Sequence, residues 1–166
     1  MEPAPEEDNT RRLQGAGTGF FAVFNRNKRS LAVDMKSGEG LALVRRLIAR
    51  SDILIENFRP GALDRLSLFW TALRVERPRL TYCNCEGFLP GPYAHRTALD
   101  EVVQIMGGLA YMTGLPGKPM RVGSSINNIL GGTFAALGIL AAVIERQETG
   151  LGKLVQAGLY ETIRCS

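Results

Sequence analysis

The sequence predicts an α/β protein built on a parallel β-sheet. Short apolar runs at residues 31–34, 52–58 and 80–86 have the length of strands, and stretches with helical periodicity lie between them. Strands that alternate with helices are typical of a parallel sheet. At 166 residues with 45% hydrophobic content, the chain is long enough to form one domain with a core.

The first strand and helix are expected at residues 31–34 and 37–50. Ser37 suits the N-cap of this helix because its hydroxyl oxygen can accept a hydrogen bond from a free backbone N–H group. The next strand, at residues 52–58, contains three consecutive aliphatic residues, Ile53, Leu54 and Ile55. Such a run indicates a strand that is buried on both faces.

A turn follows this strand at Pro60 and Gly61, and a helix is expected to begin at Ala62. The turn therefore lies at the carboxyl end of a strand, where free N–H groups and a helix N-terminus favour anionic ligands such as phosphates. Arg59 and Arg65 add positive charge at this place.

The rest of the chain continues the alternation. It predicts a helical turn at residues 70–75, a strand at 80–86, a Gly- and Pro-rich loop at 87–96 and a helix at 98–112. Residues 126–144 are apolar enough to suggest a membrane span, but they contain Asn127, Asn128 and closely spaced small residues. We interpret them as a buried helix that packs through its small residues, with no membrane partner, and a final strand follows.

The cysteines and the single histidine predict no metal site. Cys83, Cys85 and Cys165 are an odd number, which makes neither a disulfide framework nor a four-ligand zinc site and indicates a reducing compartment. Cys83 and Cys85 are expected to be core residues on opposite faces of a strand. His95 is expected to be exposed to solvent.

The charge pattern predicts no nucleic-acid partner. The net charge is +4, with clusters at residues 11–12 and 26–29, but no motif of a nucleic-acid-binding protein accompanies them. The amino end is acidic and contains proline, unlike a secretory signal peptide. We expect a cytoplasmic protein, or a mitochondrial one in a eukaryote.

Several blocks of the sequence, in order and at compatible spacing, resemble the class III coenzyme A transferases. This family includes formyl-CoA transferase, carnitine-CoA transferase and the α-methylacyl-CoA racemases. The blocks are NRNKRSLAVD at residues 25–34, ENFRPGALDRL at 56–66, LTYC at 80–83, MGGL at 106–109, RVG at 121–123 and ERQETG at 145–150. The resemblance extends from about residue 2 to residue 164.

The resemblance implies a Rossmann-like parallel-sheet large domain that is incomplete at both ends. Members of the family are more than twice as long and form interlocked homodimers, so the chain is expected to be an internal fragment of that architecture. It divides by pattern into a polar lead at residues 1–30, strand-helix alternation at 31–125, and a long apolar helix with a final strand at 126–166.

The resemblance also implies a site for acyl-CoA as substrate, with a small carboxylic acid as the second substrate. The residues that match the family's CoA contacts are Arg11, Asn57, Phe58, Ala62 and Arg65. A lysine that some members use against CoA is replaced by Thr97.

The position of the family's nucleophile departs from the pattern. Family transferases attack the thioester with an aspartate and pass through an acyl-aspartyl anhydride, but Asn128 occupies that position here. The resemblance therefore implies either a CoA-transferase with an altered catalytic position or a noncatalytic CoA-binding or interaction fragment. Asp100 is expected to be a charge at a helix N-terminus rather than a catalytic group. The racemases have a histidine where this chain has Leu99.

Overall fold

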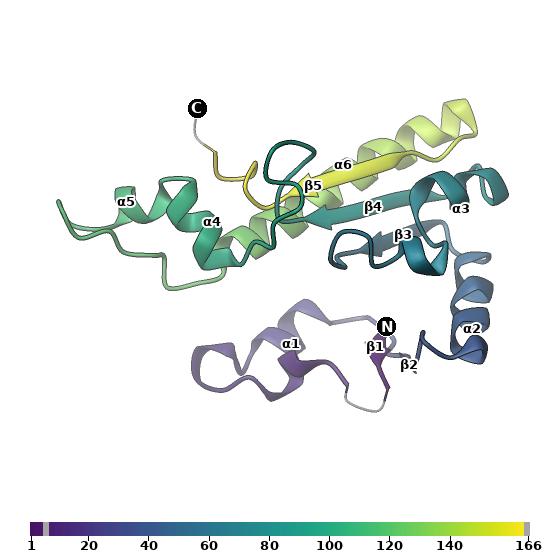
Figure 1. Ribbon diagram of the computed structural model, residues 1–166, viewed down its shortest axis with the longest axis horizontal. Coiled ribbons are helices and arrows are strands. Elements are labelled where there is room, and N and C mark those ends of the chain that lie inside the picture. The colour runs from purple at the N-terminus through teal and green to yellow at the C-terminus, as the bar shows by residue number, and fades with distance from the viewer. Residues whose placement is uncertain (5–6, 165–166) are drawn as a thin grey trace. The chain divides into compact units, whose positions relative to one another are not determined.

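The computed structural model describes residues 1–4 and 7–164, shown in Figure 1. Contacts within the chain divide it into two compact units, Met1–Arg50 and Ser51–Ser166. Cys165 lies outside the described residues. The predicted boundaries at residues 30 and 125 rest on sequence pattern and stay a prediction.

The first unit contains a small parallel sheet, short helices between its two strands, and one helix that follows the sheet in the sequence. Strand β1 (Glu2–Pro3) pairs in parallel with β2 (Ala32–Val33). Between the strands lie the short helices η1 (Asn9–Arg12), η2 (Gly15–Gly17) and α1 (Phe20–Phe24), and α2 (Gly38–Ile48) comes after them. The predicted cap of α2 is confirmed, because the hydroxyl oxygen of Ser37 accepts a hydrogen bond from Gly40 N at 3.0 Å.

The second unit is built on a parallel sheet with the strand order β3-β4-β5, as the alternation predicts. The strands are β3 (Ile53–Glu56), β4 (Thr81–Glu86) and β5 (Leu154–Gly158). The helices that connect them are η3 (Asp64–Leu66), α3 (Trp70–Glu76), α4 (Asp100–Met106), α5 (Leu109–Thr113) and α6 (Ile126–Thr149).

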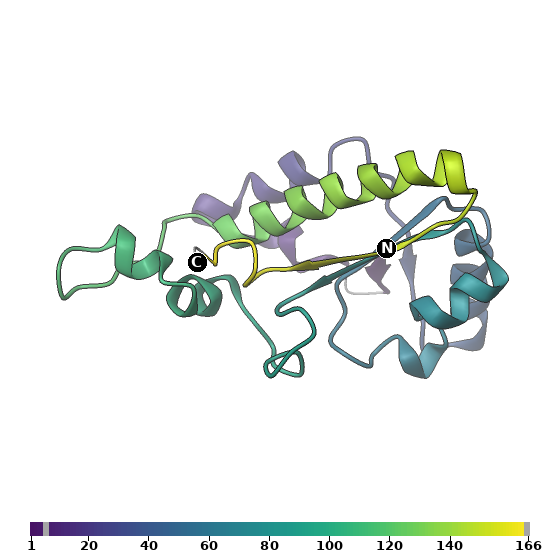
Figure 2. The ribbon, with the colours of Figure 1, turned by 90° about the horizontal axis from the view of Figure 1, so that it is seen from above.

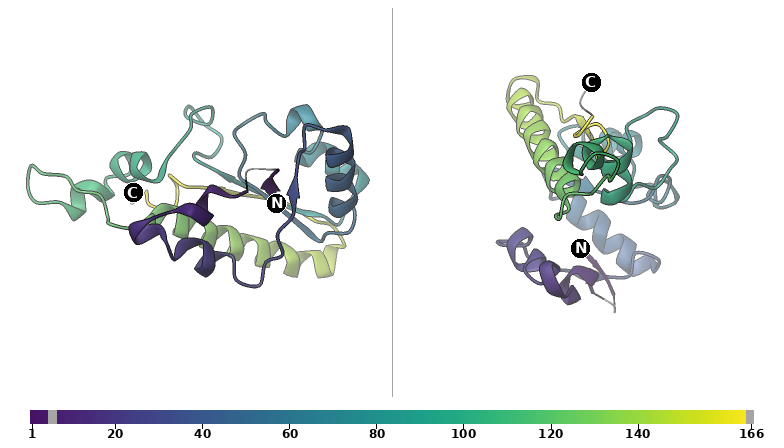
Figure 3. Two further views of the ribbon diagram at one scale, coloured as in Figure 1. Left: turned by 90° about the horizontal axis from the view of Figure 1, so that it is seen from below. Right: turned by 90° about the vertical axis from the view of Figure 1, so that its left-hand side faces the viewer.

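Helix α6 lies along β5 and covers β4 and β5 on one face of the sheet, as Figures 2 and 3 show from several sides. Its buried side consists of small and aliphatic residues, including Ala135, Ile139 and Ala142. A Cβ atom added at Gly138 would lie 2.8 Å from Cγ1 of Val155. Glycine therefore allows the helix to approach the sheet closely, as predicted.

The other side of α6 is apolar and exposed. Phe134, Leu137, Leu140 and Ile144 are each more than half exposed. By length and composition α6 could cross a membrane, but the core helix of a soluble protein meets the same test. The prediction of no membrane partner stays a prediction.

The prediction that residues 53–55 are buried on both faces is wrong. Ile53 is 37% exposed and Ile55 is 59% exposed. Strand β3 is at the edge of the described sheet, and α6 lies over β4 and β5 rather than over β3.

The helices predicted from residue 62 and over residues 98–112 are both shorter in the structure. The first is only the single turn η3, because Ser67 adopts a left-handed conformation with φ of 53°. The second breaks into α4 and α5 at Gly108, which has φ of 81°. A residue in this conformation cannot continue a right-handed helix.

Cys83 and Cys85 share one face of β4, so the prediction that they point to opposite faces is wrong. Residues two apart in a strand point to the same side of the sheet. Both cysteines belong to the cluster that packs β4 and β5 against Ala135 and Ile139 of α6. Their assignment to the core is confirmed, with Cys83 fully buried and Cys85 partly buried. His95 is exposed, as expected.

Candidate functional site at the carboxyl edge of the sheet

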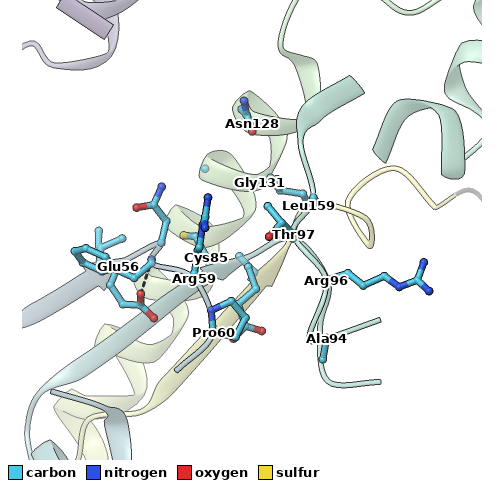
Figure 4. A pocket seen from close by; sticks show the side chains of 18 residues that line it. Glu56, Arg59, Pro60, Cys85, Ala94, Arg96, Thr97, Asn128, Gly131 and Leu159 are labelled. Carbon is cyan, nitrogen blue, oxygen red and sulfur yellow. Dashed lines mark hydrogen bonds between the residues drawn. The ribbon is translucent and has the colours of Figure 1, made fainter. Parts of the chain in front are cut away.

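A cavity of about 500 Å³ lies at the carboxyl ends of the strands of the second unit. Its wall comes from four parts of the chain: the loop after β3, the end of β4 with the loop that follows, the start of α6, and the end of β5 (Figure 4). Open parallel sheets bind ligands at this edge, because strands and helices leave their polar ends there. The cavity residues are Ile55, Glu56, Asn57, Phe58, Arg59, Pro60, Cys85, Glu86, Gly87, Ala94, Arg96, Thr97, Ala98, Asn128, Gly131, Gly132, Ala157 and Leu159.

Asn57 and Phe58 form the part of the wall that follows β3. Phe58 is 44% exposed, and its backbone N–H donates a hydrogen bond to Oε2 of Glu56 at 2.8 Å. This local bond holds the turn so that an aromatic ring stands free at the edge of the sheet.

Asn128 enters the same wall from the first turn of α6, where Figure 4 shows it above Gly131. Its side chain is exposed, and its backbone N–H donates to Oδ2 of Asp100 at 3.0 Å. Gly132 leaves the wall open, since an added Cβ atom there would meet no atom within 4 Å. The structure thus brings together Asn57, Phe58 and Asn128, which are far apart in the sequence.

Asp100 is a charge at a helix N-terminus, as predicted, but it lies at the N-terminus of one helix and accepts hydrogen bonds from the N-terminus of another. It is the first residue of α4, and its carboxylate accepts hydrogen bonds from the N-terminus of α6. It is only 8% exposed and is not among the residues that line the cavity.

Two carboxyl groups face the cavity from the last residues of adjacent strands, Glu56 of β3 and Glu86 of β4. Partial burial raises the pKa of Glu56, and the nearby carboxylate of Glu86 adds to the rise. Glu86 accepts a hydrogen bond from Nδ2 of Asn84. Sequence reasoning did not identify these two residues, although both end a predicted strand at the ligand-binding edge.

Cys85 also lines the cavity, and Cys83 lies behind it. Interaction with the neighbouring Cys85 thiol raises the pKa of Cys83, burial raises it further, and the same interaction lowers the pKa of Cys85.

A second cavity of about 320 Å³ adjoins the first and shares the wall formed by Glu56, Phe58, Arg59 and Pro60. Its other side is aromatic, with Phe69, Trp70 and Tyr82. The segment after β3 thus separates the two cavities. Together they could hold a ligand much longer than either.

Ala62 and Arg65 lie outside both cavities. Ala62 is in the turn before η3, where its N–H donates to Arg59 O at 3.0 Å. Arg65 is exposed on η3. Their assignment as CoA contacts stays a prediction.

Arg11 belongs to the first compact unit. Its guanidinium is engaged there with Glu2, with Nη2 at 2.6 Å from Oε1 and Nε at 2.9 Å from Oε2. It also lies 4.0 Å from the centre of the Phe21 ring. The hydrogen bonds from Arg11 and Ser30 lower the pKa of Glu2 to about 2.

No cluster of side chains suited to a metal ion occurs in residues 1–4 and 7–164. The cavity is lined instead by amides, an aromatic ring, arginines, carboxyl groups and apolar residues such as Ile55, Ala98 and Ala157. Such a site can hold an extended organic anion, and residue 128 presents a neutral amide to it.

Residues 1–164 match the family described as CoA-transferase family III. A succinyl-CoA–D-citramalate CoA-transferase from Chloroflexus aurantiacus is 40% identical over 148 residues, which are 88% of this chain and 37% of that protein. A formyl-CoA:oxalate CoA-transferase from Streptomyces avermitilis is 37% identical over 165 residues, which are 96% of this chain and 40% of that protein.

The fold is similar to solved structures of related proteins. A CAIB/BAIF family protein from Brucella suis matches with a TM-score of 0.89 and 36% identity, over 96% of this chain and 45% of that chain. A hypothetical protein from Mycobacterium tuberculosis matches with a TM-score of 0.87 and 28% identity, over 98% of this chain and 46% of that chain. The chain spans about two fifths of the length of the curated relatives it matches, and it belongs to CoA-transferase family III.

Proposed function

We propose that the cavity at the carboxyl edge of β3, β4 and β5 binds the thioester of coenzyme A. The observation that carries the proposal is that Asn57, Phe58 and Asn128 all line the same cavity. The first two match the family's CoA contacts, and the third matches the position of its nucleophile. To hold a thioester next to residue 128, the fold must bring these three residues together.

The chemistry of the cavity suits the parts of a CoA thioester. Ile55, Ala98 and Ala157 provide apolar surface for the pantetheine arm. Arg59 provides positive charge for phosphate groups, whereas the side chain of Arg96 extends away from the cavity in Figure 4 and its guanidinium lies 5.0 Å from the centre of the Tyr93 ring. The adjoining second cavity extends the surface for so long a ligand.

We further propose that the chain is part of an enzyme that transfers coenzyme A from an acyl-CoA to a carboxylic acid. The named relatives act on short acids such as oxalate and D-citramalate. In the family route, a carboxylate attacks the thioester carbonyl and the CoA thiolate leaves, which gives a mixed anhydride. The thiolate then attacks the enzyme's own carbonyl and releases the first acid. The acceptor carboxylate next attacks that enzyme thioester and expels the CoA thiolate, which gives a second mixed anhydride. The thiolate then attacks the acceptor's carbonyl, which forms the new acyl-CoA and releases the enzyme carboxylate.

Asn128 cannot begin this sequence. The oxygen of an amide is a weak nucleophile, because it carries no full negative charge, and the nitrogen lone pair is delocalised. This observation favours a second candidate function, a noncatalytic CoA-binding fragment that keeps the cavity without its nucleophile.

Calorimetric titration of the chain with free coenzyme A and with succinyl-CoA tests the binding proposal. We expect saturable binding, and Phe58→Ala should weaken it at least about fivefold, since truncation of a stacked aromatic ring costs ~1 kcal/mol or more. Phe134→Ala removes a similarly exposed ring from the outer side of α6 and is the matched control. Equal affinity for both variants would refute the proposed site.

The Asn128→Asp variant separates the two candidate functions. If the chain retains the rest of a transferase site, this variant should move CoA from succinyl-CoA to a labelled free acid, whereas the unchanged chain should not. CoA binding without any transfer by Asn128→Asp would support the noncatalytic candidate. Asn27→Asp is the control, because it makes the same substitution at an exposed residue of the first unit that does not line the cavity.

A further inference from the structure

Helix α6 begins without a cap of its own. Ser125 occupies the N-cap position but makes no side-chain capping hydrogen bond. Instead Oδ2 of Asp100 accepts hydrogen bonds from Asn127 N at 2.9 Å and from Asn128 N at 3.0 Å. Asn127 returns the contact, because its Nδ2 donates to Asp100 O at 3.1 Å. A carboxylate from α4 therefore fixes the first turn of α6.

Gln104, one turn further along α4, donates a hydrogen bond to the other oxygen of this carboxylate. It is fully buried, and its Nε2 donates to Oδ1 of Asp100 at 2.5 Å and to Ser124 O at 3.3 Å. Its Oε1 accepts from Val122 N at 2.7 Å. Both oxygens of Asp100 and both polar ends of Gln104 are thus occupied, and the segment just before α6 is tied to the same pair.

We propose that Asp100 and Gln104 are positioning residues that fix residue 128 at the cavity wall. The catalytic meaning of this assignment rests on the proposed function, since it supposes that residue 128 faces the reacting thioester. A hydrogen bond to the backbone N–H of residue 128 holds its Cα, and the position in the first turn then sets the direction of the side chain. Displacement of a reacting group by about 1 Å can lower a rate about a hundredfold.

In the hydrogen bond between Gln104 and Asp100, Gln104 is the donor and Asp100 is the acceptor, and two substitutions can exchange these roles. Asp100→Asn replaces one acceptor by an NH₂ group, which would face the NH₂ group of Gln104 and break one side of the arrangement. Adding Gln104→Glu places an acceptor opposite the new donor. The double variant should therefore recover much of what the single variant loses, apart from the longer bond to Ser124 O.

Amide hydrogen exchange in the whole chain tests the geometry without any need for activity. In Asp100→Asn the N–H groups of Asn127 and Asn128 should exchange about tenfold faster or more, because a neutral amide oxygen that has lost the support of Gln104 accepts their hydrogen bonds more weakly than the carboxylate does. The amide of Ile139, in the middle of α6, should change little. Glu101→Gln, on the exposed neighbouring residue of α4, is the control and should leave both amides unchanged.

The proposal would be overturned if the exchange rates of the amides at residues 127 and 128 stayed unchanged, or if the exchange rate at Ile139 rose equally. Neither result is expected if Asp100 and Gln104 fix only the first turn of α6. If Asp100→Asn does not fold, Gln104→Leu gives the same test, because it keeps the carboxylate and removes its lateral support. Slower exchange in the double variant than in Asp100→Asn would support the paired roles.

The catalytic readout uses the Asn128→Asp background. Adding Asp100→Asn should lower kcat about tenfold or more with KM for acyl-CoA within about twofold, and Gln104→Glu should restore part of kcat. A rise in KM with unchanged kcat would contradict positioning. If the background binds no CoA and transfers none, the proposed function fails, and the exchange rates at residues 127 and 128 still decide the positioning.

Discussion

In the proposed function, a single side chain, that of residue 128, decides whether the site can attack a thioester or only hold it. Asn and Asp have nearly the same shape, so the cavity wall can keep its form with either. Only the carboxylate carries the charge that a nucleophile needs. Asn57 and Phe58 line the same wall as Asn128.

The ion pair of Glu2 and Arg11 should make the first unit sensitive to acid. Glu2 has a pKa of about 2 in the folded chain, below its ordinary value of 4.5, chiefly because of the hydrogen bonds from Arg11. A lowered carboxyl pKa stabilises the folded state above the ordinary pKa, and this stabilisation is lost as the pH falls from 4.5 towards 2. Glu2→Gln should therefore lower the melting temperature at pH 7 and make little difference at pH 2.

Differential scanning calorimetry at the two pH values measures this effect. The pair is exposed, so the difference should be small and should shrink in high salt. Glu148→Gln changes an exposed carboxyl on α6 and controls for net charge. A Glu2→Gln effect that is as large at pH 2 as at pH 7 would contradict the assigned ion pair.

At the scale of elements, the close approach of α6 to β5 depends on Gly138. Gly138→Ala should destabilise the chain by about 1–2 kcal/mol, because the new methyl group would lie 2.8 Å from the stiff side chain of Val155. Gly132→Ala, in the same helix, meets no atom within 4 Å. It should stabilise the chain by up to about 1 kcal/mol through helix propensity alone.

Urea unfolding of the two variants beside the unchanged chain measures both effects. Opposite signs are the expected result. If both substitutions stabilise the chain equally, α6 and β5 are less tightly packed than the structure shows.

The elements that follow strong local signals could be predicted from the sequence. Ser37 marked the start of α2, and the apolar run from residue 126 marked α6, because capping and long periodic stretches act locally. The carboxyl edge of the sheet was predicted as the ligand site for the same reason. It follows from the order of strand and turn.

The features that depend on tertiary contacts could not be predicted. Three aliphatic residues in a row indicate burial, but β3 is at the edge of the described sheet, so Ile55 stays exposed. Asp100 was identified as a helix charge, but its bonds to α6 join residues 27 and 28 positions apart. Glu56 and Glu86 meet only when their strands pair.

At the scale of the whole molecule, the chain corresponds to about two fifths of its curated relatives. Its exposed apolar residues on α6 are consistent with surface that other protein normally covers. We propose a homodimer for the complete protein, as the family resemblance implies. An apolar strip of this kind also favours association of the chain itself.

Leu137→Lys should reduce such association, because it places a charge in the middle of the strip formed by Phe134, Leu137, Leu140 and Ile144. Sedimentation velocity over a range of concentrations should show larger species for the unchanged chain and mainly monomer for the variant. Arg65→Lys, which keeps the charge of an exposed residue elsewhere, is the control. A monomeric unchanged chain at every concentration would contradict the prediction.

The filled N-terminus of α6 has a consequence for the way in which phosphate groups can be held. Such a terminus ordinarily attracts anions, but here the chain's own Asp100 carboxylate occupies it. A polyphosphate ligand of this cavity would then have its counter-charge on exposed side chains such as that of Arg59. Dissolved salt strongly screens the attraction between solvated charges. The affinity for such a ligand should therefore fall steadily as the ionic strength rises.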